Sequence, residues 1–216
     1  MNTSASTSVS EFGKDSGLVH EAVVTGRKVG ASQTFWSRLA HNEDLFRRVV
    51  KEVMQMVVAT QPFDPVSFIG EKWSLIPEER DLRSARLTEV DFATALWEIC
   101  LNEGESSITG EEKLTRLKTS GKIRLGSTVF LGLWTDYQAR KEDSVLERLF
   151  KEQKITYLDF FGDVLLNPHG NRYVLYFFRN DGVWHWISYY LGYDWNADHL
   201  SASLACESSV LEPVTS

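Results

Sequence analysis

The residues most suited to chemistry lie near the C-terminus. Asp194, Asp198 and His199 fall within a window of six residues, and Asp163 precedes them in the same part of the chain. Carboxylate and imidazole groups together suit a divalent cation or an acid–base pair, because carboxylates are anionic ligands and imidazole titrates near neutral pH. These four residues therefore support one hypothesis, a metal-dependent hydrolase or nuclease.

The same region also has simpler structural interpretations. Asp194 and Asp198 are typical loop and helix-cap residues, and His185 lies among apolar neighbours, where a core histidine is expected. The chain has no nucleophile elbow, no P-loop, no dinucleotide-binding glycine motif and no paired-cysteine metal motif. We therefore expect no cofactor and no metal, and we favour a function that is not enzymatic.

Aromatic side chains are the second candidate, and they concentrate in the same region. Thirteen of the 26 aromatic residues (7 Trp, 7 Tyr and 12 Phe) lie between Thr156 and Trp195. Flat, rigid side chains with polar tips cover area on a partner at little cost in entropy, and they anchor many interfaces. We expect five of them to form a partner-binding face: Tyr176, Phe178, Trp184, Trp186 and Tyr190.

Two turn sequences decide which side chains share a face. NPHG (167–170) and RNDG (179–182) each place a glycine where a three-residue hairpin loop needs a left-handed backbone. With such a loop Arg179 opposes Val183, and the five aromatic residues then lie on one face. A two-residue loop at 181–182 would shift this register and regroup the faces.

These turns belong to a predicted antiparallel meander over residues 155–191, which follows a helical region over residues 31–152. We expect an α+β fold in which the helical N-terminal and central regions pack on the C-terminal meander. The single domain would span residues 31–200. Residues 1–30 and 201–216 are rich in serine and threonine, so we expect a largely disordered N-terminal tail and a C-terminal tail.

Periodicity and capping sequences place the individual helices. Apolar residues from Ser32 to Ala59 recur at spacings of three and four, and Asn42 followed by two acids indicates a break into two helices. TGEE (109–112) and SVLE (144–147) match the capping box. The predicted helices span 110–119, 127–139 and 145–152, and a helix is preferred at 88–101, where a strand fits the same periodicity.

The charge pattern argues against nucleic acid as a partner. The 216 residues include 23 lysines and arginines and 30 acids, which gives a net charge of −7. Residues 156–216 contain two arginines and no lysine against seven acids, whereas phosphate binding requires a positive groove. The basic residues of 111–155, Lys113 among them, alternate with glutamates as on a solvated helix face.

Cysteine usage and hydropathy indicate the compartment. The two cysteines, Cys100 and Cys206, are too far apart in the sequence to suggest a disulfide framework or a zinc motif. The first 18 residues lack the basic start and apolar stretch of a signal peptide, and no long apolar run follows. We therefore expect a cytoplasmic protein that does not contact a membrane.

Three stretches carry a resemblance to other proteins. GESSITGEEKLTRLK at 104–118, LGLW at 131–134 and the aromatic segment at 157–186 resemble a recurring, uncharacterised group of bacterial proteins with no assigned function. The resemblance covers residues 30–205. Its motifs are turns, caps and apolar strands, so it implies a shared fold and carries over no reaction, cofactor or site residue.

The sequence thus favours a non-enzymatic cytoplasmic module that binds another protein through the aromatic face. Both faces of the predicted meander are apolar, so either helices cover both sides or one side is presented to a partner. The sequence leaves both arrangements open. A structural homo-oligomer subunit, in which the partner is a second copy, is a further alternative.

Overall fold

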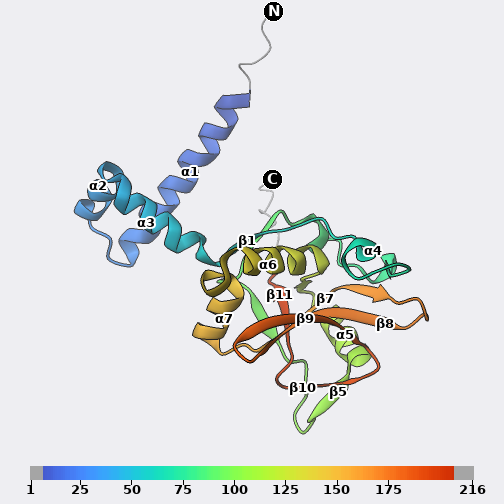
Figure 1. Cartoon of the computed structure of the whole chain (residues 1–216). Coiled ribbons are helices and arrows are strands. Elements are labelled where there is room, and N and C mark those ends of the chain that lie inside the picture. The colour runs from blue at the N-terminus through green and yellow to red at the C-terminus, as the bar shows by residue number, and fades with distance from the viewer. Residues whose placement is uncertain (1–6, 207–216) are drawn as a thin grey trace, which may run out of the picture. The chain divides into compact units, whose positions relative to one another are not determined.

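The computed structural model describes residues 7–206 (Figure 1). The chain divides into two compact units, residues 1–53 and 54–216. None of the helices within the described range is both long enough and apolar enough to cross a bilayer.

Side-chain caps separate the helices of the first unit. The Ser32 hydroxyl accepts a hydrogen bond from the Phe35 amide at 3.2 Å, and the Asn42 side-chain oxygen accepts one from the Leu45 amide at 2.9 Å. The predicted break at Asn42 is therefore confirmed. The helices are α1 (Thr7–Lys28), α2 (Gln33–His41) and α3 (Glu43–Val53).

Helix α1 lies where the sequence predicts a disordered tail over residues 1–30. Trp36 from α2 packs so closely on Gly26 of α1 that a Cβ atom there would collide with the indole ring. This contact joins two helices, and the serine-rich composition gives no sign of it. The structure thus differs from the prediction over residues 7–28, and residues 1–6 lie outside the described part.

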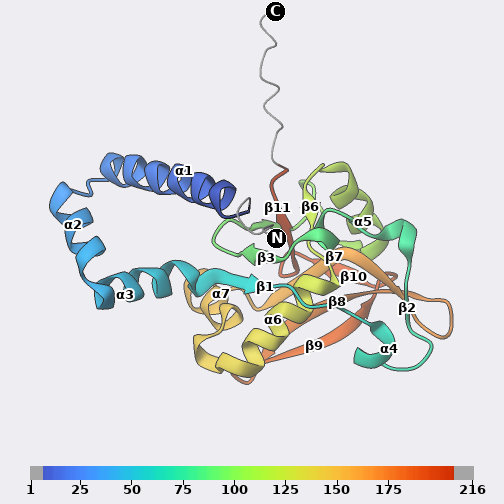
Figure 2. The same cartoon turned by 90° about the horizontal axis from the view of Figure 1, so that it is seen from above.

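The second unit contains a mixed sheet with helices packed on it, which confirms the predicted α+β class (Figure 2). Its helices are α4 (Pro65–Phe68), α5 (Gly110–Thr119), α6 (Ser127–Arg140) and α7 (Val145–Gln153), with short 3₁₀ turns η1 (Met54–Met56), η2 (Pro77–Glu79), η3 (Ser84–Arg86) and η4 (Lys141–Asp143). Its strands are β1 (Val57–Ala59), β2 (Ser74–Leu75), β3 (Glu89–Asp91), β4 (Leu96–Glu98), β5 (Ser107–Thr109), β6 (Ile123–Arg124), β7 (Tyr157–Leu166), β8 (Arg172–Asn180), β9 (Val183–Tyr190), β10 (Asp194–Asn196) and β11 (Leu200–Leu204).

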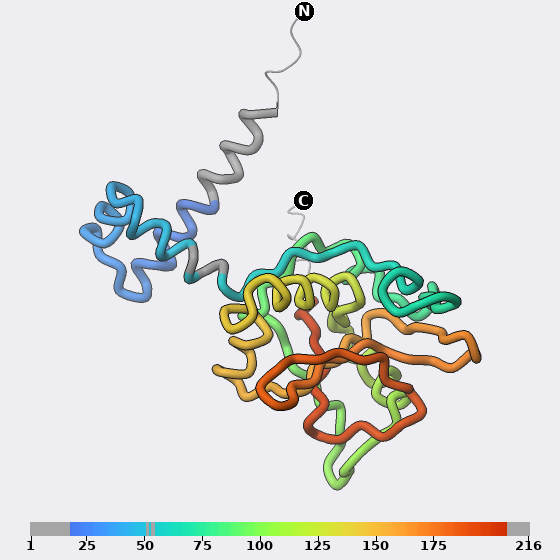
Figure 3. Tube along the Cα trace, in the orientation of Figure 1, coloured from blue at the N-terminus to red at the C-terminus, as the bar shows by residue number. Residues whose placement is uncertain are grey.

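The strands form one large sheet and two small pairs. The large sheet has the order β4-β11-β7-β8-β9, with β2 beside β7 and β6 beside β11. All of its pairings are antiparallel except that of β11 with β7. β1 pairs with β3, and β10 pairs with β5. Figure 3 traces the chain from β9 through β10 back to β11 in the middle of the sheet.

The three central helices occur where the sequence places them. Thr109 and Ser144 cap α5 and α7 by accepting hydrogen bonds from the amides of Glu112 and Glu147, each at 3.3 Å. The glutamates of the two boxes do not bond back to the cap amides: the carboxylate of Glu147 binds Arg179, and that of Glu112 binds Arg116. The predicted helix starts are confirmed.

The predicted meander consists of β7, β8 and β9. Its first turn is the expected three-residue loop, in which the Asn167 amide donates to the Asn171 carbonyl at 3.0 Å and Gly170 has a φ of +80°. The second turn has two residues, since Asn180 opposes Val183. The predicted pairing of Arg179 with Val183 is therefore wrong, and the alternative two-residue loop is correct.

The reason lies in the backbone of the second turn. Asp181 and Gly182 have φ angles of +49° and +79°, the pattern of a type I′ turn, whose twist matches that of the flanking strands. Aspartate tolerates the left-handed conformation better than most residues, which allows the shorter loop. Every side chain of β9 consequently lies on the face opposite to the predicted one relative to β8.

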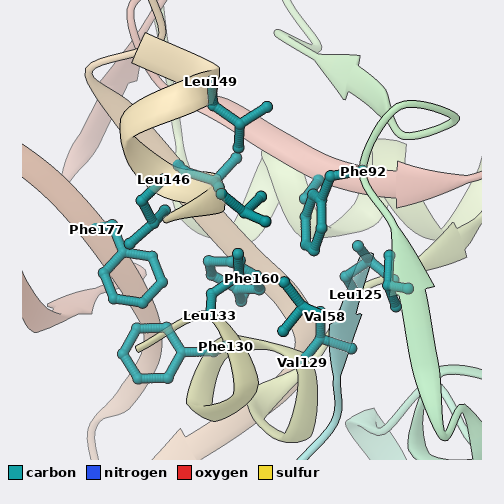
Figure 4. Packing of buried hydrophobic residues seen from close by; sticks show 14 of the residues in the cluster. Val58, Phe92, Leu125, Val129, Phe130, Leu133, Leu146, Leu149, Phe160 and Phe177 are labelled. Carbon is teal, nitrogen blue, oxygen red and sulfur yellow. The ribbon is translucent and has the colours of Figure 1, made fainter. Parts of the chain in front are cut away.

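Helices cover both faces of the middle of the sheet. On one face α6 places Phe130 against Phe177 of β8, with ring centroids 4.3 Å apart, and α7 adds Leu146 and Leu149 (Figure 4). On the other face α5 and β10 form a second buried cluster with the sheet: Leu114, Leu117, Phe161, Val164, Val174, Leu191 and Trp195.

Two further predictions are corrected. Residues 88–101 form β3 and β4 instead of the preferred helix, because Asp91 turns the chain by accepting a hydrogen bond from the Ala93 amide at 2.9 Å.

The predicted C-terminal tail begins with β11, a central strand. Its Ser201, Ala202 and Ser203 are buried between β4 and β7, and these small side chains give no hydrophobic signal in the sequence. Residues 207–216 lie outside the described part.

Candidate functional site: an aromatic surface above a buried ion pair

A buried ion pair lies between α5 and the sheet. The Lys113 ammonium nitrogen is 3.0 Å from Asp159 Oδ2 and 2.7 Å from the carbonyl oxygen of His199, and both charged side chains are 0% exposed. The rings of Phe161 and Trp195 have their centroids 5.5 and 5.3 Å from the same nitrogen. The pair therefore ties α5, β7 and the turn before β11 to one point.

His199 closes the cluster on the side toward solvent. Its Nδ1 is 3.5 Å from Asp159 Oδ1, and its side chain is 13% exposed. The imidazole is enclosed by four aromatic rings with centroids 4.9 to 5.9 Å from its own: Tyr157, Tyr176, Tyr189 and Trp195. An aspartate–histidine pair can activate a protein hydroxyl or a water molecule. Ser201 opposes Asp159 in the register of β11 and β7, but its buried hydroxyl has no hydrogen-bond partner within residues 7–206, so it does not form a triad with Asp159 and His199.

The tyrosines above the ion pair are held in their neutral form. Burial, with smaller contributions from Tyr189, Tyr157 and Asp159, raises the pKa of Tyr176 to about 12. Burial also raises the pKa of Tyr189, with further contributions from Tyr193, Asp194 and Asp159. The hydroxyl groups of Tyr176 and Tyr189 thus keep their protons to a higher pH than an exposed tyrosine does.

The four residues of the hydrolase hypothesis do not form one site. Asp163 lies four residues beyond Asp159 on β7, where it accepts hydrogen bonds from Arg80 at 2.8 Å and from the Ser127 hydroxyl at 2.6 Å. Asp194 begins β10, and Asp198 lies in the turn that follows it. Within the described chain, no three residues among His, Cys, Asp and Glu are grouped closely enough to hold a metal ion.

The five predicted partner-binding residues are also divided, because the second turn shifts the register. Tyr176 and Phe178 lie on the face toward α5, together with the β9 residues that oppose them. Trp184 is 1% exposed in the core on the α6 side, and Trp186 packs there on Phe68 and Phe130. Tyr190 contacts Tyr173 on the same α6 side. The single five-residue aromatic face is therefore a wrong prediction.

A different aromatic surface runs along β9 on the face of the sheet toward α5, from His185 near the second turn to Tyr189 and Tyr193 at the other end. Phe178 stacks on His185 with a centroid distance of 5.2 Å, and Tyr189 contacts Tyr193 at 5.5 Å. Ile187 is 37% and Tyr193 is 57% exposed. We call the six residues of this region the tyrosine surface: Tyr157, Phe178, His185, Ile187, Tyr189 and Tyr193.

The exposed charges that follow β9 are negative, whereas those beside the Asp181 turn are mixed, because Lys141 and Lys151 line a pocket together with Gly182 and Val183. Asp181, Asp194 and Asp198 are exposed, and none of them takes part in an ion pair among the described residues. The two arginines of this region are already neutralised, Arg172 by Glu79 and Glu111, and Arg179 by Glu147. The surface therefore combines aromatic rings with unpaired negative charge.

Sequence reasoning missed two parts of this site. Lys113 is buried, whereas the sequence was interpreted as a solvated helix face. A signal was present, because Lys113 lies one turn before Leu117, on the apolar side of α5. Ile187 and Tyr193 were missed because the register of the second turn decides which face they occupy, and the turn sequence is compatible with two loop lengths.

Removing one charge of the buried pair is expected to destabilise the second unit strongly. Lys113→Met leaves Asp159 buried without its ammonium partner, which typically costs about 3–5 kcal/mol in the free energy of unfolding. The double variant Lys113→Met/Asp159→Leu should recover most of this loss. Urea denaturation followed by tryptophan fluorescence measures both, with Glu152→Gln, in an exposed pair, as the control. A loss below about 1 kcal/mol for Lys113→Met would contradict a buried, structurally required pair.

The raised pKa of Tyr176 makes a prediction about alkaline pH. The unfolded tyrosine ionises near pH 10 and the folded one near pH 12, so the folded state retains the proton between these values. The free energy of unfolding should therefore fall as the pH rises from 10 to 12, and it should fall less in Tyr176→Phe. Denaturant titrations at several alkaline pH values test this, and equal slopes for the two proteins would show that Tyr176 is accessible to water.

Comparison with known proteins adds no further constraint. No protein-family model, no curated protein and no solved structure matches this chain. The function is therefore argued from the residues themselves.

Proposed function

We propose that this protein is a non-enzymatic interaction module that binds a basic segment of a partner protein on its tyrosine surface. The observation that carries the proposal is a surface on which the exposed Tyr193, Ile187 and His185 adjoin half-buried aromatic rings. Asp194 and Asp198 follow Tyr193 in the chain, and both are exposed without an ion pair among the described residues. It keeps the function favoured by the sequence and replaces the five predicted anchors with residues of the tyrosine surface.

The chemistry of the surface selects the partner. Lysine and arginine side chains can place their apolar stems on the exposed Ile187 and the half-buried Phe178, and their charged ends over tyrosine rings. Asp194, next to Tyr193, and Asp198 then supply the opposite charge, which speeds encounter and disfavours acidic partners. Phosphate groups are repelled by the same aspartates, so the surface is a poor match for nucleic acid.

The alternatives have less support. A metal-dependent hydrolase or nuclease would need several ligands grouped beside His199, and no such group occurs among the described residues. A homo-oligomer built on the tyrosine surface would bring Asp194 and Asp198 of two copies together. The free thiols of Cys100 and Cys206 support a cytoplasmic location, where cysteines stay reduced.

Labelled peptides test the proposal directly. We expect a fluorescent octapeptide of alternating lysine and valine to bind, and the matched peptide of alternating glutamate and valine not to bind. Tyr193→Ala should raise the Kd for the basic peptide about tenfold, the size expected for the loss of an aromatic anchor. Asp194→Asn should raise it about threefold and weaken its dependence on salt. Fluorescence anisotropy titrations at two salt concentrations give all of these values.

Val66→Ala is the matched control, because Val66 is 48% exposed in α4 and is not part of the tyrosine surface. Its Kd should equal that of the wild type. Equal affinity for both peptides, or an unchanged Kd in Tyr193→Ala, would refute the proposed surface.

A further inference from the structure

The strand β9 has a free edge. It is the last strand in the order of the large sheet, and within residues 7–206 its only strand partner is β8 (Figure 2). The outer side of such a strand exposes main-chain groups that can pair with another chain.

The type I′ turn determines which groups point outward. In a two-residue hairpin the closing pair, here Asn180 and Val183, is hydrogen-bonded, so alternate residues from Val183 onward bond to β8 and the residues between them face away. Two observations agree that Trp184 and Tyr190 are among the residues that face away from β8. The Trp184 amide donates to the Tyr137 hydroxyl at 3.2 Å, and the Tyr190 carbonyl accepts from the Tyr193 amide at 3.1 Å.

Trp186 and Ser188 remain between these two occupied positions. Neither the amide nor the carbonyl of either residue has a main-chain or side-chain hydrogen-bond partner within residues 7–206. An added strand bonds to every second residue of an edge, so these four groups have the spacing that it requires. One residue of the new strand would bond to Trp186, and the residue two positions along would bond to Ser188.

Between the occupied positions Trp184 and Tyr190, the edge also lacks the protection that natural sheets normally give to such strands. Edge strands are commonly guarded by lysine, by proline, by a bulge or by a covering element. The sequence of β9, VWHWISYY, contains no lysine, no acid and no proline, and its pairing with β8 runs without a bulge from Val183 to Tyr190. An eight-residue strand of this kind is suited to receive a partner strand.

We propose that the basic partner segment binds as an extended strand added to the edge of β9, with its main chain bonded to Trp186 and Ser188. This rests on the proposed function and adds the conformation and the residue pattern of the partner. Side chains of an added strand alternate between the two faces of the sheet. Those on the face toward α5 lie beside Ile187 and Tyr189 and should be basic, and those on the opposite face lie beside Trp186 and should be apolar.

The position of the acids favours a basic segment over a second copy. Antiparallel pairing of two β9 edges would bring the Asp181 turn of each copy toward the Asp194 end of the other. Both ends of such an interface would then hold aspartates that face each other. A basic strand meets the same aspartates with opposite charge.

One substitution tests the main chain of the edge without changing the hairpin. Because the Ser188 amide points away from β8, Ser188→Pro removes an outward donor and no bond within the sheet. Its matched control is Ser188→Ala, which removes the hydroxyl and keeps the amide. We expect Ser188→Pro to raise the Kd for the lysine–valine octapeptide at least tenfold, and Ser188→Ala to change it less than twofold. Circular dichroism and thermal unfolding report whether both variants fold.

A second measurement leaves the protein unchanged and serves if Ser188→Pro does not fold. Two octapeptides are N-methylated at alternate residues, one on the odd positions and one on the even positions. Only alternate amides of an added strand face β9, so one peptide should lose binding and the other should keep it.

The outcomes separate this inference from the proposed function. If Ser188→Pro binds normally or both methylated peptides bind equally, while Tyr193→Ala still weakens binding, the strand addition is wrong and the proposed function stands. If the basic octapeptide does not bind the wild type at all, the proposed function fails. Dimerisation that Ser188→Pro abolishes, without peptide binding, would overturn the basic partner in favour of a second copy.

Discussion

The buried pair of Lys113 and Asp159 is the interaction on which the arrangement of the second unit depends. It holds α5 against β7 and, through the carbonyl of His199, the turn that leads into β11. The start of α5 is fixed at the same place, since the amides of Gly110 and Glu111 donate to the carbonyls of Tyr193 and Leu191, each at 3.1 Å. A side chain at Gly110 would collide with Leu191 and Trp195, so the close approach requires glycine. Beside α5, the side chains of Ile187 and Tyr193 on the same face remain exposed.

The turn at Asp181 and Gly182 supplies the second constraint. Its two left-handed residues set the register of β9 against β8, and this register sends Trp184 and Trp186 toward the core under α6. It also places Ile187 and Tyr189 on the open face and directs the amides of Trp186 and Ser188 away from the sheet. The tyrosine surface and the free edge are therefore two consequences of one short loop.

The sequence predicted the parts of the fold that depend on local chemistry. The caps at Thr109 and Ser144, the break at Asn42 and the first hairpin loop all occur as expected, because each is determined by hydrogen bonds between residues close together in the chain. The α+β class followed from these elements and from the aromatic meander.

The errors concern features that depend on distant partners. Residues 200–204 form a central strand only because β4 and β7 bury both of its sides, and their small side chains have no periodic pattern. Lys113 is buried because Asp159, 46 residues away in the chain, neutralises it. The candidate site was misplaced by a single residue of register, since RNDG is compatible with two loop lengths and the faces of a strand exchange with each shift of one residue.

Amide hydrogen exchange in β9, followed by NMR on the protein alone, tests the central claim that this edge and the adjoining face are open. The account predicts that the amides of Trp186 and Ser188 exchange rapidly, while those of Ile187 and Tyr189, bonded to β8, exchange more slowly by orders of magnitude. Adding the basic octapeptide should slow the first pair selectively. Uniform protection along β9 in the free protein would mean that the edge is already paired, and it would contradict the account.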